Sequence, residues 1–537
     1  MPDQLQLRGG TTSEHNSFTG VAREVTVDTT KKTLVVHDGS TAGGTPLMKQ
    51  SGHTGDSTFN SVTVGKGANS VANNTVLGES ALDAAVTGQG NTAIGKSALS
   101  ANTSGANNVA IGRQSLAANT TASDNTAVGA YTLDSNTTGT ENTAVGYLAL
   151  QANETSSGNT AVGFATLDAN SSGNNNTGIG RAALGANTTG NDNVAVGKNA
   201  LDSNTTASNN TAVGSRALAA NTTGGSNTAF GDQALEANTT GVLNTALGAN
   251  ALEANTTASN NTAVGTKALQ NNTTGAANTA VGKEALRVAT TANHNTALGH
   301  QALEATTTGA YNNAVGSNTL AANTTGSYND AVGYATLNVN TTGQYNTGIG
   351  HYNLGQNTTV SQNVAVGALA LDANIDGNYN IGVGVHALGG NTTADNNIAV
   401  GTNALKTNST GASNVAIGND ALDANTTASY NNAHGHLSLS ANTTGERNNA
   451  FGHSSLGVNT TGQYNTAVGH SALYANTTAS SNTAVGNDAL TANTTGDQNV
   501  AVGANALDAN TTGTNNTAVG QGALGANTTA QNNTAVG

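Results

Sequence analysis

Two histidines, His434 and His436, flank a glycine in the segment A-H-G-H and have the residue type and spacing of metal ligands. Alternate residues of a β-strand point to the same face, so both imidazoles would lie on one side. Three chains would then supply six imidazoles to one octahedral transition-metal ion. Two alternatives stay open: Gly435 turns the chain between the rings, or the position simply tolerates a polar residue.

A second pattern consists of His436, His453 and His470, which follow one another at a spacing of 17 residues. In a stack of repeats, each of these histidines would lie about 5 Å from the next. Such a column would form a metal ladder or a pH-sensing stripe. Lys, Arg, Ser and Tyr occupy the same position elsewhere in the chain, which favours a solvated, variable column instead.

Tyrosines recur at another position of the same period. They include Tyr328, Tyr345 and Tyr464, each five positions before a recurring glycine. A row of exposed aromatic faces would stack on the sugar rings of a host glycan. The competing interpretation is that the rings pack at a turn or between chains.

Carboxylates are the residues that glycoside hydrolysis would require, as a pair held at a defined separation in a cleft. Asp and Glu often follow a recurring leucine by one position, but only Glu236 and Glu253 fall in adjacent repeats. This pattern is typical of a solvated face that avoids stacked like charges. The motifs G-G-x-G-x-D and G-x-x-x-x-G-K-[ST] are also absent from the sequence. The sequence therefore predicts no enzyme.

All of these residues belong to one repeat, N-T-A-V-G-x-x-A-L-x-A-N-T-T-G-x-x. Its fifth residue, here termed the marker glycine, recurs without insertion or deletion from Gly78 to Gly537, a distance of 459 residues or 27 times 17. Asn stands four positions before the marker glycine in all 28 copies, and Leu stands four positions after it in all 27 complete units. The columns begin with Asn74, Asn91 and Asn108, with Gly78, Gly95 and Gly112, and with Leu82, Leu99 and Leu116.

So short a repeat cannot bury a core within one unit, so the units must stack on one another. The sequence predicts an all-β fold, a parallel β-solenoid or β-roll of 17-residue coils. T-A-V is expected to form a strand that points the Val or Ile before the marker glycine inward. The marker glycine suits a corner with positive φ, and the Asn column suits a side-chain ladder. The leucine segment would form a second strand or a single helical turn.

The coils have consequences for size and assembly. At about 4.8 Å per coil, 27 coils predict a rod of roughly 130 Å. One coil has little apolar area, so we expect a homotrimer of intertwined or side-by-side chains. We divide the chain into a β-hairpin module at 1–55, a transition with a first short coil at 56–77, and the array at 78–537. The expected hairpin joins residues 24–28 and 33–38 through Thr-Thr-Lys-Lys.

Composition limits the partners. The formal net charge is -14 and only 9% of the residues are charged, which disfavours nucleic acid and anionic membranes as partners. Cysteine is absent, so neither disulfides nor thiolate metal sites are expected. No secretion signal, and no run of 18 apolar residues that would insert into a membrane, occurs in the sequence.

The amino-acid sequence of the repeats resembles that of two protein families. N-S-V-T-V-G at residues 60–65 is similar to coils in the heads of trimeric autotransporter adhesins, which are left-handed parallel β-rolls. The 17-residue form, as in NTAVGYLAL, resembles repeats in bacteriophage tail fibres, and residues 7–47 are similar to the amino-terminal module of many such fibres. The resemblance implies an amino terminus that docks on the virion, and iron as the metal for a His-x-His pair.

We therefore expect a structural tail fibre that projects from a phage particle and attaches it to a host surface glycan or protein. A bacterial surface adhesin or extracellular filament subunit is the first alternative, and the absence of a secretion signal and a membrane anchor disfavours it. An ice-binding solenoid is the second alternative, because regular Thr rows can order water. The Thr-Thr pairs lie in a glycine-containing turn, which disfavours that reading.

Overall fold

A computed structural model describes residues 8–19, 25–30, 33–37, 40, 42, 45–46 and 56–537. The chain divides into two compact units, residues 1–172 and 173–537, and each is described by itself. Both contain a run of parallel strands that recur every 17 residues, so the predicted all-β solenoid is confirmed. The helices in the described part of the chain are α1 (Thr12–Ser17) and the 3-10 turn η1 (Ala68–Ser70). Neither is long and apolar enough to cross a bilayer.

The first unit begins with a small four-stranded sheet of β1 (Arg8–Gly10), β2 (Val25–Asp28), β3 (Thr33–Val36) and β4 (Thr45–Pro46). β2 pairs antiparallel with β3, which confirms the predicted hairpin, although Glu24 and Asp38 lie outside the described residues. β1 pairs parallel with β2, and β4 antiparallel with β3.

A short antiparallel segment precedes the coils. It consists of β5 (Ser57–Phe59), β6 (Val62–Gly65) and β7 (Thr75–Gly78), and β6 pairs antiparallel with both neighbours. The segment N-S-V-T-V-G therefore forms a hairpin and not the expected first short coil. The reason is local: Asn60 and Ser61 both have positive φ, 47° and 67°, the geometry of a tight two-residue hairpin turn.

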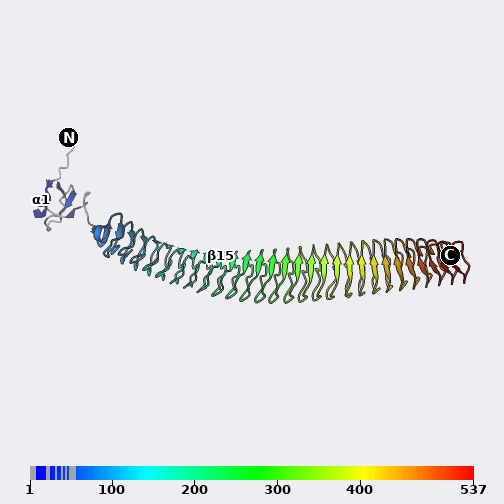
Figure 1. Cartoon of the computed structure of the whole chain (residues 1–537). Helices are drawn as coiled ribbons and strands as arrows, with labels where there is room; N and C mark the ends of the chain where they lie inside the picture. The colour runs from blue at the N-terminus through cyan, green and yellow to red at the C-terminus, as the bar shows by residue number, and fades with distance from the viewer. Residues whose placement is uncertain are drawn as a thin grey trace, which may run out of the picture. The chain divides into compact units, whose positions relative to one another are not determined.

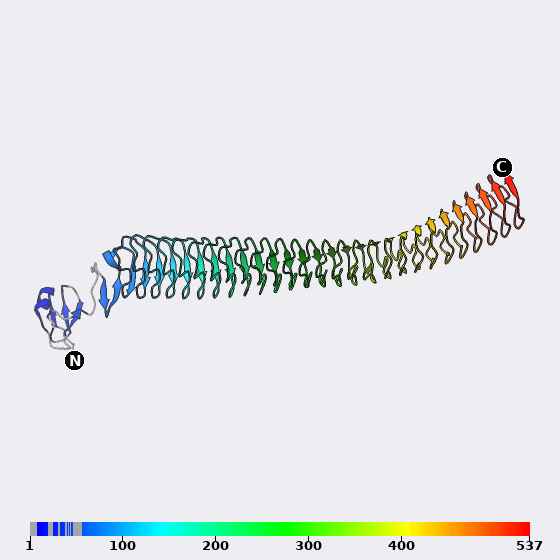
Figure 2. The same ribbon diagram turned by 90° about the horizontal axis from the view of Figure 1, so that it is seen from below.

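From β7 onward, strands within each unit pair in parallel and in register with the strand 17 residues away, as in Thr126↔Thr143 and Thr262↔Thr279. Figures 1 and 2 show these strands as one arrow per coil, lying side by side within each unit. In the first unit they are β8 (Thr92–Ile94), β9 (Val109–Ile111), β10 (Thr126–Val128), β11 (Thr143–Val145) and β12 (Thr160–Val162).

The strands of the second unit are β13 (Thr177–Ile179), β14 (Val194–Val196), β15 (Thr211–Val213), β16 (Thr228–Phe230), β17 (Thr245–Leu247), β18 (Thr262–Val264), β19 (Thr279–Val281), β20 (Thr296–Leu298), β21 (Asn313–Val315), β22 (Asp330–Val332), β23 (Thr347–Ile349), β24 (Val364–Val366), β25 (Ile381–Val383), β26 (Ile398–Val400), β27 (Val415–Ile417), β28 (Asn432–His434), β29 (Asn449–Phe451), β30 (Thr466–Val468), β31 (Thr483–Val485), β32 (Val500–Val502), β33 (Thr517–Val519) and β34 (Thr534–Val536).

The inward residue of the coil strands is the central one, which is alanine in most strands and glycine in β13, β23 and β25. Ala110 and Ala127 are fully buried, whereas Ile111, directly before its marker glycine, is 37% exposed. The prediction that Val or Ile points inward is therefore wrong. Alternate residues face opposite sides of a strand, so the central residue is the only one of three that faces the core. The narrow interior accepts a methyl group, and the β-branched residues occupy the outer pleated surface, which they favour.

The leucine segment forms neither a second strand nor a helical turn, so both expectations are wrong. Leu99 and Leu116 are fully buried and have φ of 51° and 50°, in the left-handed region. Their amides donate to the next coil, from Leu99 N to Ser115 O and from Leu116 N to Thr132 O, at 3.0 Å each. Hydrogen bonds between coils replace the intrasegment bonds of a helix, and the left-handed conformation turns the leucine into the core.

The marker glycines are required by the stacking as well as by their φ. Gly95 has φ 127°, and a Cβ built on it would lie 2.5 Å from the carbonyl oxygen of Gly112 in the next coil. A side chain would force adjacent coils apart. The column thus fixes the close approach of neighbouring backbones.

Two outer columns also hold non-glycine residues at positive φ, and they predict a sequence restriction. Ser97, two positions after its marker glycine, and Asn107, five positions before the next one, have φ of 56° and 58°. Neither column contains Val, Ile or Thr in any copy. β-Branched residues are poorly accommodated in this region.

Ser226→Val is therefore expected to destabilise its coil by about 1–2 kcal/mol. Ser226 is exposed and has φ 58°, so a valine there would add backbone strain without adding buried contacts. Hydrogen exchange of the surrounding peptide measures this loss. Ser226→Asn, which tolerates the left-handed region, is the control. Equal exchange in the two variants would contradict the explanation.

Candidate functional site

The two histidines of the predicted metal site lie in different columns. His434 is the last residue of β28, points outward rather than inward, and stacks on Phe451 with ring centroids 4.7 Å apart. His436 is exposed beyond Gly435, whose φ is 142°, and stacks on His453 at 5.2 Å. In the described part of the chain, no group of three or more His, Cys, Asp or Glu side chains lies close enough to hold a metal ion.

The histidine column continues to His470, whose ring stacks on His453 at 5.2 Å and 6°. The Nδ1 of His470 lies 3.1 Å from the Ser471 hydroxyl and 3.9 Å from an Asp488 carboxylate oxygen. The three imidazoles therefore stack face to face along the coils. Only the ring edges remain open between neighbours.

The tyrosine column forms a longer stack of the same kind. Tyr311 and Tyr328 have centroids 5.1 Å apart, and Tyr328 and Tyr345 have centroids 5.0 Å apart, with both ring pairs parallel to within 1°. His294 continues the stack, 4.9 Å from Tyr311. Both faces of Tyr328 are covered by neighbouring rings, so a sugar would reach its edge and hydroxyl rather than its face. Tyr345 ends the stack, because Gln362 follows it in the column.

A cation lies within a second part of this column. The Arg447 guanidinium lies 5.6 Å from the ring centre of Tyr430 and 5.5 Å from that of Tyr464. Its Nη1 also donates to the Tyr464 hydroxyl at 3.2 Å. The arrangement satisfies the charge by cation–π contacts on both sides. It leaves the far face of Tyr464, toward Ser481 in the next coil, without an aromatic neighbour.

Charged residues gather beside the leucine turn and line a polar groove of about 1070 Å³ in the second unit. Arg216 pairs with Glu236, and Glu253 accepts hydrogen bonds from Gln270 at 2.7 Å and from Asn250 at 3.1 Å. Glu236 and Glu253, the only adjacent carboxylates of their column, are thus each held by a separate partner. The groove offers hydrogen bonds and charge to a polar ligand.

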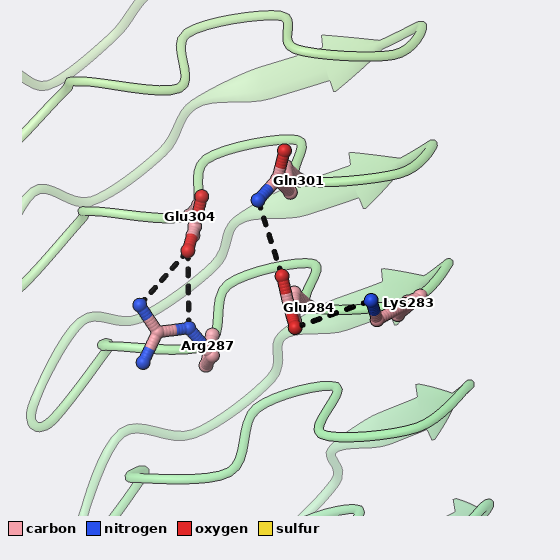
Figure 3. A network of polar contacts seen from close by, with 5 residues as sticks. All are labelled: Lys283, Glu284, Arg287, Gln301 and Glu304. Atoms are coloured by element: carbon pink, nitrogen blue, oxygen red, sulfur yellow. Dashed lines mark hydrogen bonds and ion pairs between the residues drawn. The ribbon is translucent and has the colours of Figure 1, made fainter.

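The same face continues in the following coils (Figure 3). Arg287 donates to Glu304 from Nε at 3.1 Å and Nη2 at 2.8 Å, and Gln301 donates to Glu284 at 3.1 Å. Partial burial alone would raise the pKa of Glu284, but Lys283, the Gln301 hydrogen bond and Arg287 together outweigh it and lower that pKa. These contacts tie neighbouring coils together at the surface.

Burial raises the pKa of three other carboxylates in the column after the leucine: Asp134, Asp372 and Asp423. None of the three has a second carboxylate of this column in an adjacent coil. These three carboxylates are therefore single, partly buried acids, and none of them forms the facing pair that glycoside hydrolysis needs.

The predicted asparagine column lies inside the fold. Asn91 and Asn108 are fully buried. The backbone amide of each Asn donates to the side-chain oxygen of the Asn in the previous coil, from Asn91 N to Asn74 Oδ1 at 2.9 Å and from Asn108 N to Asn91 Oδ1 at 3.0 Å. Each Nδ2 donates to a carbonyl of the next turn, as from Asn91 to Gly105 at 2.9 Å. The side chain thus satisfies backbone groups that the short strand leaves unpaired.

A second asparagine ladder was not predicted. Asn102, Asn119 and Asn136, the first residues of N-T-[TS], are fully buried, and Nδ2 of Asn119 donates to Asn102 Oδ1 at 2.9 Å. Nδ2 of Asn119 also donates to Ala122 O, closing its own turn at 3.1 Å. The signal was present in the regular N-T-T triplet, but turn chemistry explained it equally well. The core therefore contains two polar ladders beside its Ala and Leu columns.

The second ladder is interrupted in two places. Asn340 Oδ1 and both side-chain polar atoms of Asn357 are buried without a hydrogen-bond partner, and the other interruption is at residue 289. Ala289 replaces the asparagine, and the Oδ1 of Asn272 in the preceding coil is buried with no hydrogen-bond partner. An unpaired buried acceptor costs about 1–3 kcal/mol, so Ala289→Asn is expected to stabilise these coils by about 1 kcal/mol or more. Thermal unfolding and hydrogen exchange of the surrounding peptides measure the gain. Ala292→Asn, at a buried position outside the ladder, should destabilise, and a gain there would contradict the ladder explanation.

The comparisons with known proteins concern the amino terminus. Residues 5–41 match the family model described as Major tropism determinant N-terminal domain. The chain is 63% identical over 49 residues to the "Tail fiber receptor-binding protein" of Bordetella phage BPP-1. This match covers 9% of the present chain and 13% of the phage protein, so the chain spans only a small part of that relative's length. No solved structure matches the chain. The amino-terminal region is thus similar to that of a phage tail fibre receptor-binding protein, and a 17-residue-repeat β-solenoid follows it.

Proposed function

We propose that this protein is a tail fibre on the surface of a phage virion and that it attaches the particle to its host. The amino-terminal module would dock on the virion tail or capsid, and the solenoid would carry an adsorption surface outward as a homotrimer. The observation that carries the proposal is the 63% identity of the amino-terminal region to a phage tail fibre receptor-binding protein. The 17-residue spacing of the strands supports the structural part of the role.

The proposed role is structural and includes no catalysis. The most regular polar side chains, the two asparagine ladders, are fully buried and bond to the chain itself. Of the carboxylates in the polar groove, Glu236 pairs with Arg216, Glu253 accepts from Gln270 and Asn250, and Asp202 accepts from Asn199. These contacts support a role in stiffness and solubility.

For the host contact we propose the tyrosine column, with Tyr328, Tyr345 and Tyr464 facing a surface glycan or protein. Because Tyr328 is covered on both faces, it would contribute its hydroxyl, and the ends of the stacks at Tyr345 and Tyr464 would offer a ring face. The triple variant with phenylalanine at 311, 328 and 345 keeps the stack and removes the hydroxyls. This variant should weaken adsorption if the tyrosine hydroxyls bind the host surface. Unchanged adsorption would exclude the hydroxyls as the host contact.

The predicted metal site becomes a proposal about the trimer. Two imidazoles per chain, His434 and His436, would combine across three chains to hold one transition-metal ion, iron among the candidates. The outward direction of His434 supports a shared site between chains. Metal analysis of the purified assembly should find one ion per three chains, and His434→Val should remove it. Absence of stoichiometric metal would end this proposal.

The experiment that tests the main proposal is antibody labelling of intact virions together with competition for host adsorption by the purified chain. Labelled fibres and slower adsorption are expected. Labelling of the bacterial surface in uninfected cells would favour the adhesin alternative. Hydrogen bonding within the fold disfavours the ice-binding alternative. The first Thr of most Thr-Thr pairs already donates its hydroxyl to the next coil, as from Thr120 to Thr137 O at 3.2 Å.

A further inference from the structure

An apolar column runs along the outer face of the strands. It consists of the residue directly before each marker glycine and is called the apolar stripe below. In the second unit it includes Phe230, Leu247, Leu298, Ile349 and Phe451, with exposed fractions of 54, 45, 46, 45 and 41%. We infer that the apolar stripe is the surface through which copies of this chain pack against one another. The inference rests on the homotrimer proposed above and identifies its interface.

The residue types of the stripe differ from those of other exposed columns. In the 22 strands from β13 to β34, the stripe holds Val, Ile, Leu or Phe in every strand except β28, where it holds His434. The column on the other side of the marker glycine accepts Lys198, Asp232 and Lys283 as readily as small residues. β-Propensity alone would admit Thr as readily as Val, yet Thr does not occur in the stripe, whereas packing against another chain excludes polar and charged residues alike.

The second outward position, the first residue of each strand, strengthens the contrast. Together the two positions give 44 outward residues in 22 strands, and Asp330 is the only Asp, Glu, Lys or Arg among them. The formal net charge of -14 is carried elsewhere, including the polar groove with Arg216, Glu236 and Glu253. Depletion of charge around an apolar centre is the composition of the core of a protein interface. Copies facing one another by their strands would therefore bring little like charge together.

The exposed area of the apolar stripe is sufficient for a stable interface. A stable interface buries about 800 Å² per partner, which spread over 22 coils is about 36 Å² per coil. A half-exposed phenylalanine such as Phe230 supplies about twice that amount by itself. No single coil needs a large contact, because the repeat multiplies a small one.

The stripe also suits copies that run in parallel. Identical coils present an apolar residue at every step of the repeat, so parallel chains in the same register align equal residues all along. The large side chains Phe230, Phe451 and His434 would each meet their own counterparts, which disfavours a slipped register. Parallel chains place all amino-terminal modules at the same end, as docking on one virion requires.

The test uses the full chain, which contains no cysteine. A single introduced cysteine therefore shows whether that one position lies close to its counterpart in another copy. Leu247→Cys places a thiol in the stripe, and Thr257→Cys places one on an exposed turn ten residues further on. Each variant, at low protein concentration, is treated with a short bifunctional maleimide and analysed on a denaturing gel. The mass of the native assembly is measured separately by sedimentation. We expect Leu247→Cys to yield linked pairs at least tenfold in excess of Thr257→Cys.

The outcomes separate the interface from the trimer. A trimeric mass without preferential linking through Leu247→Cys overturns the stripe as the interface and leaves the trimer standing. A monomeric mass overturns both, while virion labelling still decides the fibre role. The double variant Leu247→Lys/Leu298→Lys should lose the trimeric mass while retaining its β-type circular dichroism. Retention of the trimer by this folded variant would also overturn the inference.

Discussion

Gly350→Ala is expected to open the solenoid locally and to be among the most damaging single changes in the second unit. A Cβ at Gly350 would lie 2.5 Å from the oxygen and 2.7 Å from the carbonyl carbon of Gly367, and φ at Gly350 is 140°. The clash is with backbone, so it cannot be relieved by a side-chain rotation. Strain at the disfavoured φ and overpacking each cost about 1–3 kcal/mol, which gives roughly 4 kcal/mol together.

Gly355→Ala, in the same coil, is the matched control. Its Cβ would meet Tyr352 O at 3.4 Å and Asp372 O at 3.5 Å, which is ordinary contact. The change should alter stability by no more than about 0.5–1 kcal/mol. Hydrogen exchange of peptides that cover residues 333–367 in both variants measures the difference. Equal protection would mean that backbone approach between coils does not explain the marker glycines.

Asn261→Ala is the second change expected to have a large effect. Asn261 is fully buried, its Nδ2 donates to Gly275 O at 2.9 Å, and its Oδ1 accepts from the backbone amide of Asn278 at 2.9 Å. Alanine would leave the buried backbone amide of Asn278 without a partner, whereas Gly275 O would keep its second donor, Asn272 Nδ2, at 2.9 Å. An unpaired buried amide costs about 1–3 kcal/mol, so the coils around it should lose about 2 kcal/mol.

Two further variants separate hydrogen bonding from volume. Asn261→Asp retains an acceptor for Asn278 but loses the donor to Gly275 and buries a charge, so it should be at least as damaging as alanine at neutral pH. Thr257→Ala changes an exposed side chain of the same coil and should have little effect. Protection of the Asn278 amide from hydrogen exchange is the most direct measurement. Normal protection in Asn261→Ala would contradict the ladder as its source.

Both effects should remain local. In a stacked repeat, stability is approximately a sum over coils and their nearest neighbours, so the chain does not unfold as one two-state unit. Distant peptides are therefore expected to exchange at the rate of the unmodified protein. This locality makes peptide-resolved exchange a sharper measurement than a single melting temperature.

The functional surface was predicted only in part. The 17-residue spacing placed Tyr328 with Tyr345 and His436 with His453 in common columns, and coil spacing explains their ring contacts. It did not predict that stacking would cover both faces of Tyr328, because ring orientation depends on the left-handed backbone at that position. The separation of His434 from His436 likewise follows from Gly435, whose φ of 142° ends the strand alternation between them.

The sequence alone determined the period, and the period determined the architecture. Seventeen residues with one Leu and few other large side chains cannot enclose a core, so stacking into a β-solenoid was the only way to bury Leu99 and its equivalents. The tertiary structure decided which side of T-A-V faces inward. Ala and Val are both apolar, so an alternating pattern is equally consistent with either direction. Hydrogen bonds between coils hold the buried leucines in a left-handed turn, and the central alanines face the core beside them.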